Sequence, residues 1–103
     1  MRVLEAVRTR RSIRRYKKQP VPQEKLEKIL DAGRWAPSAS NSQPWKFIVV
    51  TDPNIKEKLA EFLPWGEFLV EAPLAIAVVV DPRASVHFME DGSLAAYSIL
   101  LAA

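Results

Sequence analysis

The sequence contains no cysteine, which excludes two kinds of structure at the outset. Neither a disulfide framework nor a thiolate metal site can form, and nothing indicates an oxidising compartment. We therefore expect a cytoplasmic protein. Histidine is nearly absent as well: the only one, His87, falls in a loop-like stretch. We interpret it as a surface or packing residue rather than a proton donor, so the sequence predicts no catalytic side chain and no metal site.

Long hydrophobic runs are missing too. The longest apolar stretch, around Leu74 to Val80, is far too short to span a bilayer. The first residues, Met1 to Glu5, lack the apolar core of a signal peptide. The sequence therefore predicts neither export nor insertion into a membrane.

The length and composition indicate one folded unit. The chain has 103 residues, of which 49% are hydrophobic and 26% charged, a balance typical of a protein with a core. Two domains in so short a chain would each struggle to bury enough apolar surface. We therefore expect residues 1–103 to form a single domain.

The positive charge is concentrated at the start of the chain. The formal net charge is only +3, but eight cationic residues among the first eighteen face a single acid, Glu5. They are Arg2, Arg8, Arg10, Arg11, Arg14, Arg15, Lys17 and Lys18. An anionic partner is therefore to be sought first at this segment.

Apolar periodicity and turn-forming residues predict the secondary structure. We expect helices at residues 3–7, 23–34, 55–62 and 91–103, and strands at 46–51 and 74–80. The second helix is predicted to end near Gly33, a common helix-stop residue, and Asp52 or Asn54 is predicted to cap the third. The strand at 74–80 is apolar on both faces, so we expect it to be central and covered by helices.

The last predicted helix is unusually apolar. Leu94, Tyr97, Ile99, Leu100 and Leu101 crowd residues 91–103, and no helix-stop signal follows them. Such surface is costly to leave in water. We expect either a continuation beyond residue 103 or a buried partner interface.

The segment from Thr9 to Tyr16 is the first candidate for binding. Guanidinium groups offer forked donors that match phosphate oxygens, and the hydroxyl of Ser12 adds a further contact. Two alternatives remain open from the residues alone, a solvated basic stretch and a nucleic-acid patch.

The loop from Ala36 to Trp45 is the second candidate. Its small hydroxyl residues allow a backbone to approach a flat heterocycle closely, and Asn41 and Gln43 offer polar groups for its edge. The alternative is a rigid loop whose side chains satisfy only their own backbone. Trp35 and Trp45 are assigned mainly to packing. Trp65 and Gly66 are weaker candidates for lining a site.

Taken together, these two segments resemble the nitroreductase family. The resemblance lies in Arg-Arg-Ser-Ile-Arg at 10–14 and Ala-Pro-Ser-Ala-Ser-Asn-Ser-Gln-Pro-Trp at 36–45. It extends through the strand at 47–50, through Glu71-Ala72-Pro73 and into the helix that starts near Asp91. It implies an α+β fold, with helices around a mainly antiparallel sheet, in an intertwined homodimer. Family members continue well past this helix, so the resemblance implies a chain that is incomplete at its C-terminus.

The resemblance also implies a flavin site shared between two subunits. Arg10, Arg11 and Ser12 would hold the phosphate and ribityl chain of FMN, and Arg14 would lie near the pyrimidine edge of the flavin. A cation there stabilises the negative charge of reduced flavin. The residues expected to face the flavin of the other subunit are Pro37, Ser38, Ala39, Ser40 and Asn41.

The implied activity is that of an FMN-dependent oxidoreductase. NAD(P)H would deliver a hydride to the flavin and leave, and a nitroaromatic, quinone or similar electron-poor acceptor would then take its place. Such chemistry requires little acid or base catalysis from the protein. The alternative is a non-enzymatic chain, either a truncated subunit or a basic module that binds polyanions, although the uncharged loop at 36–45 has no evident use in the latter.

Overall fold

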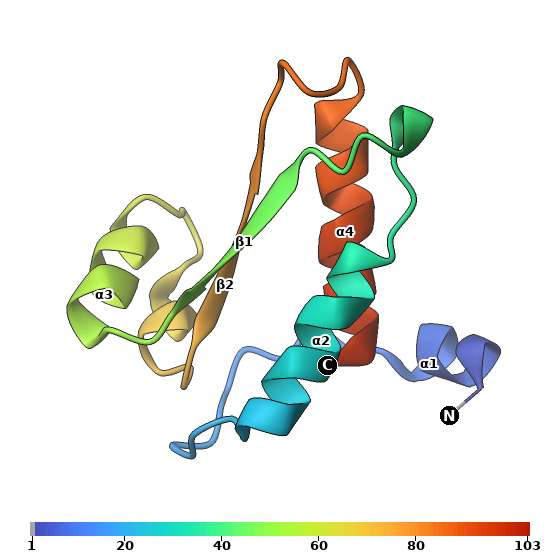
Figure 1. Cartoon of the computed structure of the whole chain (residues 1–103). Coiled ribbons are helices and arrows are strands. Elements are labelled where there is room, and N and C mark those ends of the chain that lie inside the picture. The colour runs from blue at the N-terminus through green and yellow to red at the C-terminus, as the bar shows by residue number, and fades with distance from the viewer. Residues whose placement is uncertain (1) are drawn as a thin grey trace.

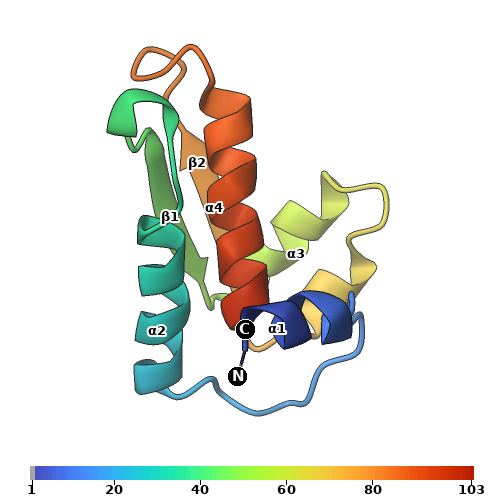
Figure 2. The same cartoon turned by 90° about the vertical axis from the view of Figure 1, so that its right-hand side faces the viewer.

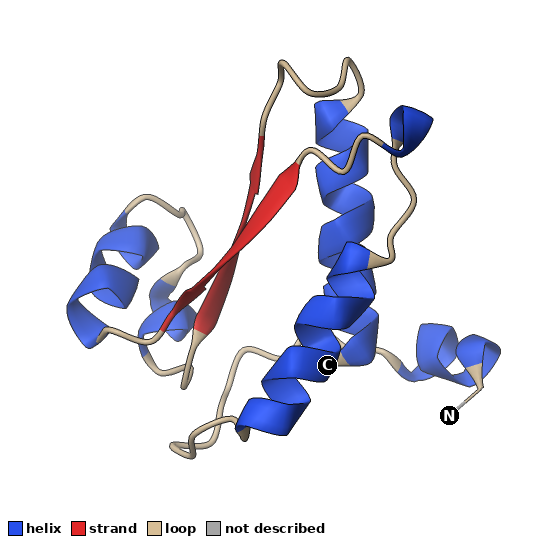
Figure 3. Cartoon of the chain, viewed as in Figure 1, coloured by secondary structure: helices blue, strands red, loops and turns tan. Residues whose placement is uncertain are grey.

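The computed structural model describes residues 2–103, and within them four α-helices accompany a two-stranded sheet (Figure 1). Figure 3 separates the helices and strands by colour. The elements in chain order are α1 (Val3–Thr9), α2 (Gln23–Arg34), the 3-10 turn η1 (Ala39–Asn41), β1 (Trp45–Val50), α3 (Pro53–Glu61), the 3-10 turn η2 (Glu67–Val70), β2 (Ala75–Val80) and α4 (Phe88–Ala102). This confirms the α+β prediction and every expected helix and strand, with α4 beginning three residues earlier than expected.

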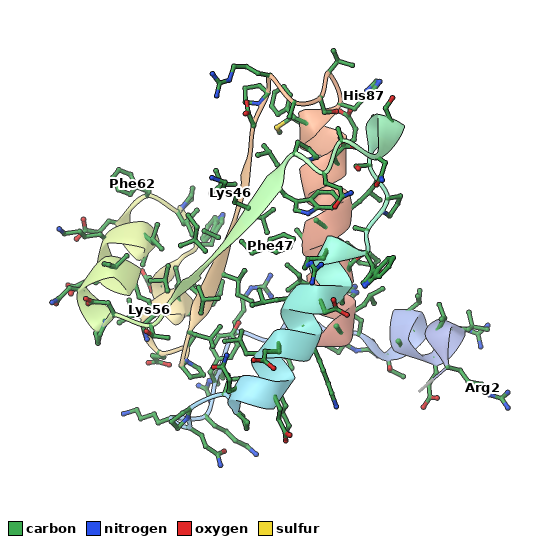
Figure 4. All side chains as sticks on the ribbon, in the orientation of Figure 1. Arg2, Lys46, Phe47, Lys56, Phe62 and His87 are labelled. Carbon is green, nitrogen blue, oxygen red and sulfur yellow. The ribbon has the colours of Figure 1, made fainter. Side chains whose placement is uncertain are left out.

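The two strands pair antiparallel, and their register separates an inner from an outer face. Phe47 lies opposite Val78 on the inner face, which α2 and α4 cover (Figures 1 and 4). Lys46 lies opposite Val79 on the outer face, where Val79 is 46% exposed. The expectation that residues 74–80 form a central strand is wrong for the described chain, because β2 pairs there with β1 alone.

Two glycines set how closely the helices approach the sheet. A Cβ atom on Gly33 would lie 2.8 Å from Cζ of Phe47 and 2.9 Å from Cγ1 of Ile99, so α2, β1 and α4 meet at this point. A Cβ atom on Gly92 would lie 2.7 Å from Cγ1 of Val80. The prediction that α2 ends near Gly33 is confirmed, because the last residue of the helix is Arg34. Gly33 is also buried, at a position where a larger side chain would displace its neighbours.

The third helix follows the predicted capping. Asp52 is the N-cap of α3, and its Oδ1 accepts a hydrogen bond from the backbone N–H of Asn54 at 2.8 Å. Lys56 is 6% exposed, and its Nζ donates to the carbonyl of Ala72 at 2.6 Å. This bond ties α3 to the chain that enters β2, whereas Phe62 at the end of α3 is 83% exposed (Figure 4).

Among residues 2–103, no helix combines the length and apolar character that crossing a membrane requires. The longest is α4, with fifteen residues.

The packing at Gly33 generates the first prediction. Gly33→Ala should lower the free energy of unfolding by about 1–3 kcal/mol, because overpacking against Phe47 and Ile99 outweighs the gain of up to about 1 kcal/mol in helix propensity. Urea denaturation measures the change. Glu27→Ala, on the exposed face of the same helix, is the matched control and should change stability by no more than about 0.5 kcal/mol. A Gly33→Ala protein as stable as the parent would contradict the close packing.

Candidate functional site

The basic segment after α1 lies open to solvent. Arg11, Ser12 and Arg14 are exposed and Arg10 is half-buried. Nη1 of Arg11 donates to the carbonyls of Arg8 at 3.1 Å and Arg10 at 2.8 Å, which satisfies carbonyls left free at the end of α1. The ion pairs found in residues 2–103 all lie elsewhere in the chain, so these guanidinium groups are not neutralised by acids.

The first candidate segment borders a hollow beside the end of α4. This surface hollow has a volume of about 800 Å³, and Arg10, Arg11 and Ile13 line it together with Leu100 and Leu101 of α4. Cationic donors therefore lie at the mouth of a partly apolar recess, an arrangement that suits a phosphate attached to a larger organic group.

The segment that follows is held at one point. The ring of Tyr16 packs against that of Phe68 in η2, with centroids 6.2 Å apart, and its hydroxyl donates to the carbonyl of Ile13 at 2.6 Å. This contact attaches an otherwise exposed stretch to the body of the protein.

The second candidate segment is a strained loop. Three residues other than glycine have positive φ angles within four positions: Ser40 at 53°, Asn41 at 53° and Gln43 at 47°. Each such residue costs on the order of 1–3 kcal/mol, and strain of this kind concentrates at functional sites. The loop must therefore be held by bonds that offset this cost.

Bonds at both ends and across the middle hold the loop. The N–H of Ala39 donates to Oδ1 of Asp91 at 3.0 Å, and the N–H of Asp81 donates to the carbonyl of Pro44 at 2.9 Å. Oγ of Ser38 accepts from the N–H of Gln43 at 3.0 Å and closes the loop on itself. Its conformation is thus determined by α4 and by the residue that follows β2.

Asp81, whose N–H holds the Pro44 end of the loop, forms hydrogen bonds with Arg83 through its own carboxylate. The carboxylate of Asp81 accepts from the backbone N–H of Arg83 at 2.9 Å and from its guanidinium at 3.2 Å. Both bonds lower the pKa of Asp81 below its ordinary value, and the bond from the backbone N–H has the larger effect. Asp81 therefore stays ionised to a lower pH than a free aspartate.

Three residues that the sequence did not assign to the site lie at the loop. A hollow of about 230 Å³ is lined by Trp35, Asn41 and Gln43 along with Arg34 and Ala36. Trp35 is 81% exposed, so its assignment to packing is wrong.

The other two residues are Asp91 and Ser85, which are buried beneath the loop. Because a sequence contains no signal for a contact across 52 positions, the bond from Ala39 to Asp91 could not be found in advance.

The two remaining tryptophans and the histidine lie in different parts of the structure. Trp45 stacks against Phe47 with ring centroids 6.3 Å apart, as expected for packing. Trp65 is 84% exposed and precedes η2, away from the loop. His87 is exposed at the start of α4, where its Nδ1 lies 3.0 Å from Oε2 of Glu90 (Figure 4).

The structure does not bring the two candidate segments together within one chain. The loop lies beside the first turn of α4, whereas Arg10 and Arg11 lie beside its last turn (Figure 2). A fifteen-residue helix separates such points by roughly 22 Å. One copy of the described chain therefore holds the two candidate segments at opposite ends of one helix.

Comparisons with known proteins agree on one family. The model of the nitroreductase family matches residues 7–98. A protein of Methanothermobacter thermautotrophicus, provisionally named an NADH dehydrogenase/NAD(P)H nitroreductase, is 45% identical over 100% of this chain and 56% of its own length. A crystal structure from Parabacteroides distasonis with the same provisional name superposes with a TM-score of 0.93 and 42% identity, covering 97% of this chain and 60% of the other.

A third similar protein carries a cofactor. A provisionally named nitroreductase of Desulfovibrio desulfuricans, crystallised in complex with FMN, superposes with a TM-score of 0.88 and 38% identity. The match covers 97% of this chain and 60% of the other. The chain thus spans a little over half the length of these three relatives.

The backbone strain of the loop generates the second prediction. Because Ser40 is exposed, substitutions there report on the backbone rather than on packing. Ser40→Gly should raise the free energy of unfolding by up to about 1 kcal/mol, and Ser40→Val should lower it by about 1–2 kcal/mol, because a β-branched residue tolerates a positive φ least. Urea denaturation of the series measures the order Gly, Ser, Val. The reverse order would rule out the strained conformation.

Proposed function

This chain belongs to the nitroreductase family, and on that premise we propose that it forms the N-terminal part of an FMN-dependent, NAD(P)H-linked oxidoreductase that reduces nitroaromatics, quinones or similar electron-poor acceptors. The observation that carries this proposal is the pairing of an unneutralised basic segment with a strained, uncharged loop at the two ends of α4. A polyanion-binding module would need the first segment but has no use for the second.

The basic segment has the donor chemistry that the phosphate of FMN requires. Arg10 and Arg11 supply forked donors at a recess of suitable size, and the next residue, Ser12, offers a hydroxyl. We assign these three residues to the phosphate and ribityl chain. Arg14 is assigned to the pyrimidine edge of the ring. The flavin, when bound, supplies the redox chemistry, accepting electrons from NAD(P)H and passing them to the acceptor. The protein binds and orients the flavin and stabilises the negative charge of its reduced form.

The second half-site would come from another copy of the chain. We assign Pro37, Ser38, Ala39, Ser40 and Asn41 to the flavin held by that copy. If two α4 helices pack antiparallel about a two-fold axis, the loop at the start of one helix lies beside the basic segment at the end of the other. Such packing also explains the exposed apolar residues along α4: Met89, Leu94, Tyr97 and Leu100.

The decisive experiment is an absorbance spectrum of the chain after incubation with FMN and desalting, followed by addition of NADH. A retained yellow colour that bleaches is expected. Binding to DNA that weakens steeply with salt, without retention of flavin, would instead favour the polyanion-binding alternative.

Arg14→Ala tests the assignment of the ring edge. Loss of a charge-assisted contact worth about 1.5–3 kcal/mol should weaken FMN binding by roughly 10- to 100-fold, as measured by quenching of flavin fluorescence. Arg15→Ala removes the same charge from the next residue, which is also exposed, and should leave the affinity within about threefold. Equal losses of FMN affinity in the two variants would show that Arg14 contributes only through the overall charge of the segment, and would contradict the assignment.

Tyr97→Lys tests the interface. A lysine on each of two facing helices places like charges in an apolar contact, so the variant should sediment as a monomer while retaining its helical circular dichroism. Trp65→Lys, which replaces an exposed aromatic residue outside α4, should leave the dimer intact. A parent chain that sediments as a monomer, or a dimeric Tyr97→Lys variant, would contradict the α4 interface.

A further inference from the structure

We propose that Asp91 is a positioning residue that holds the loop at 38–43 in the conformation presented to the cofactor. The inference rests on the proposed function, since it assigns this loop to the flavin site. Asp91 lies in the first turns of α4 and would itself touch neither cofactor nor substrate.

The carboxylate of Asp91 joins three segments of the chain. It is 2% exposed, accepts the N–H of Ala39 at 3.0 Å and accepts the hydroxyl of Ser85 at 2.7 Å. Oγ of Ser85 accepts in turn from the N–H of His87 at 3.0 Å. The loop, the connection after β2 and the start of α4 are therefore held by one buried network.

A buried carboxylate is costly unless its hydrogen bonds are made. No lysine, arginine or histidine forms an ion pair with Asp91 in the part of the chain that the structure describes, so the backbone N–H and the hydroxyl are its partners. An apolar residue would avoid this cost. The position therefore suits a group that must accept a hydrogen bond from the loop.

The bond is made where the strain begins. Ala39 is the first residue of η1 and directly precedes Ser40 and Asn41, which have positive φ angles. Without an acceptor for the N–H of Ala39, Ser40 and Asn41 can relax to negative φ, which would turn their N–H groups and side chains away from the surface that they now form. Asp91 thus pre-organises the loop before any ligand arrives.

A simpler role for Asp91 is that an acid near the N-terminus of α4 stabilises the helix dipole. That role predicts a general loss of stability when Asp91 is replaced. The positioning role predicts a change confined to the loop, together with rescue by asparagine, whose amide oxygen can still accept from Ala39 while its amide nitrogen donates to Ser85.

Amide hydrogen exchange measured by NMR without any ligand separates these roles. In Asp91→Ala the N–H of Ala39 should exchange at least tenfold faster, relative to the amides that pair β1 with β2, than in the parent. Asp91→Asn should stay within threefold. The matched control is Leu26→Ala, which removes core packing in α2 and should accelerate loop and sheet amides alike. If Asp91→Ala accelerates Ala39 no more than the sheet, the proposal is overturned.

A second variant covers the case in which Asp91→Ala does not fold. Ser85→Ala removes one donor to the carboxylate but leaves the acceptor for Ala39, so it should accelerate exchange at Ala39 by about three- to tenfold, more than Asp91→Asn does. If Ser85→Ala and Asp91→Asn both leave the exchange rate at Ala39 unchanged but accelerate exchange in the sheet, the network is purely structural. That outcome would overturn the proposal.

Binding of FMN then connects the loop to function. Asp91→Ala should weaken the affinity at least tenfold, whereas Asp91→Asn and Leu26→Ala should remain within threefold of the parent. A faster-exchanging loop with unchanged affinity would overturn the positioning role. If the parent chain itself binds no FMN, the proposed function fails for this chain, and the exchange measurement alone decides whether Asp91 holds the loop.

Discussion

The fold depends on how closely two helices approach one face of a two-stranded sheet. At Gly33 the backbone of α2 lies against Phe47 of β1 and Ile99 of α4, and at Gly92 the backbone of α4 lies against Val80 of β2. No side chain larger than hydrogen fits at either point without displacing its neighbours. Because close-packed interiors transmit small displacements, these two contacts fix the position and the direction of α4 along the sheet.

The position of α4 in turn organises the candidate site. Its first turns bring the buried carboxylate of Asp91 under the loop at 38–43, and its last turns line the recess beside Arg10 and Arg11. A rigid helix thereby sets the separation of two segments that each lack regular structure over most of their length. The candidate binding groups thus lie on exposed segments, and a packed element holds the distance between them.

The elements of this fold could be predicted because their signals are local. Apolar spacing predicted α2 and α4, and β-branched runs predicted β1 and β2. Asp52 and Asn54 were the two candidates for the cap of α3, and the structure selects Asp52. The sequence was less informative where the outcome depended on distant partners. The end of α2 near Gly33 was predicted, but the close contact of Gly33 with Phe47 and Ile99 was not. The strand β2 has the composition of a central strand but pairs with a single neighbour in the described chain.

The family, the secondary structure and the two candidate segments could be read from the sequence, because motifs and periodicities are properties of neighbouring residues. The folded chain was needed to establish that Trp35 is exposed, that three loop residues have positive φ angles, and that Asp91 and Ser85 lie beneath that loop. Only it placed the two segments at opposite ends of α4. The physical reason is that burial, strain and hydrogen bonds between residues 52 positions apart exist only after the chain has packed.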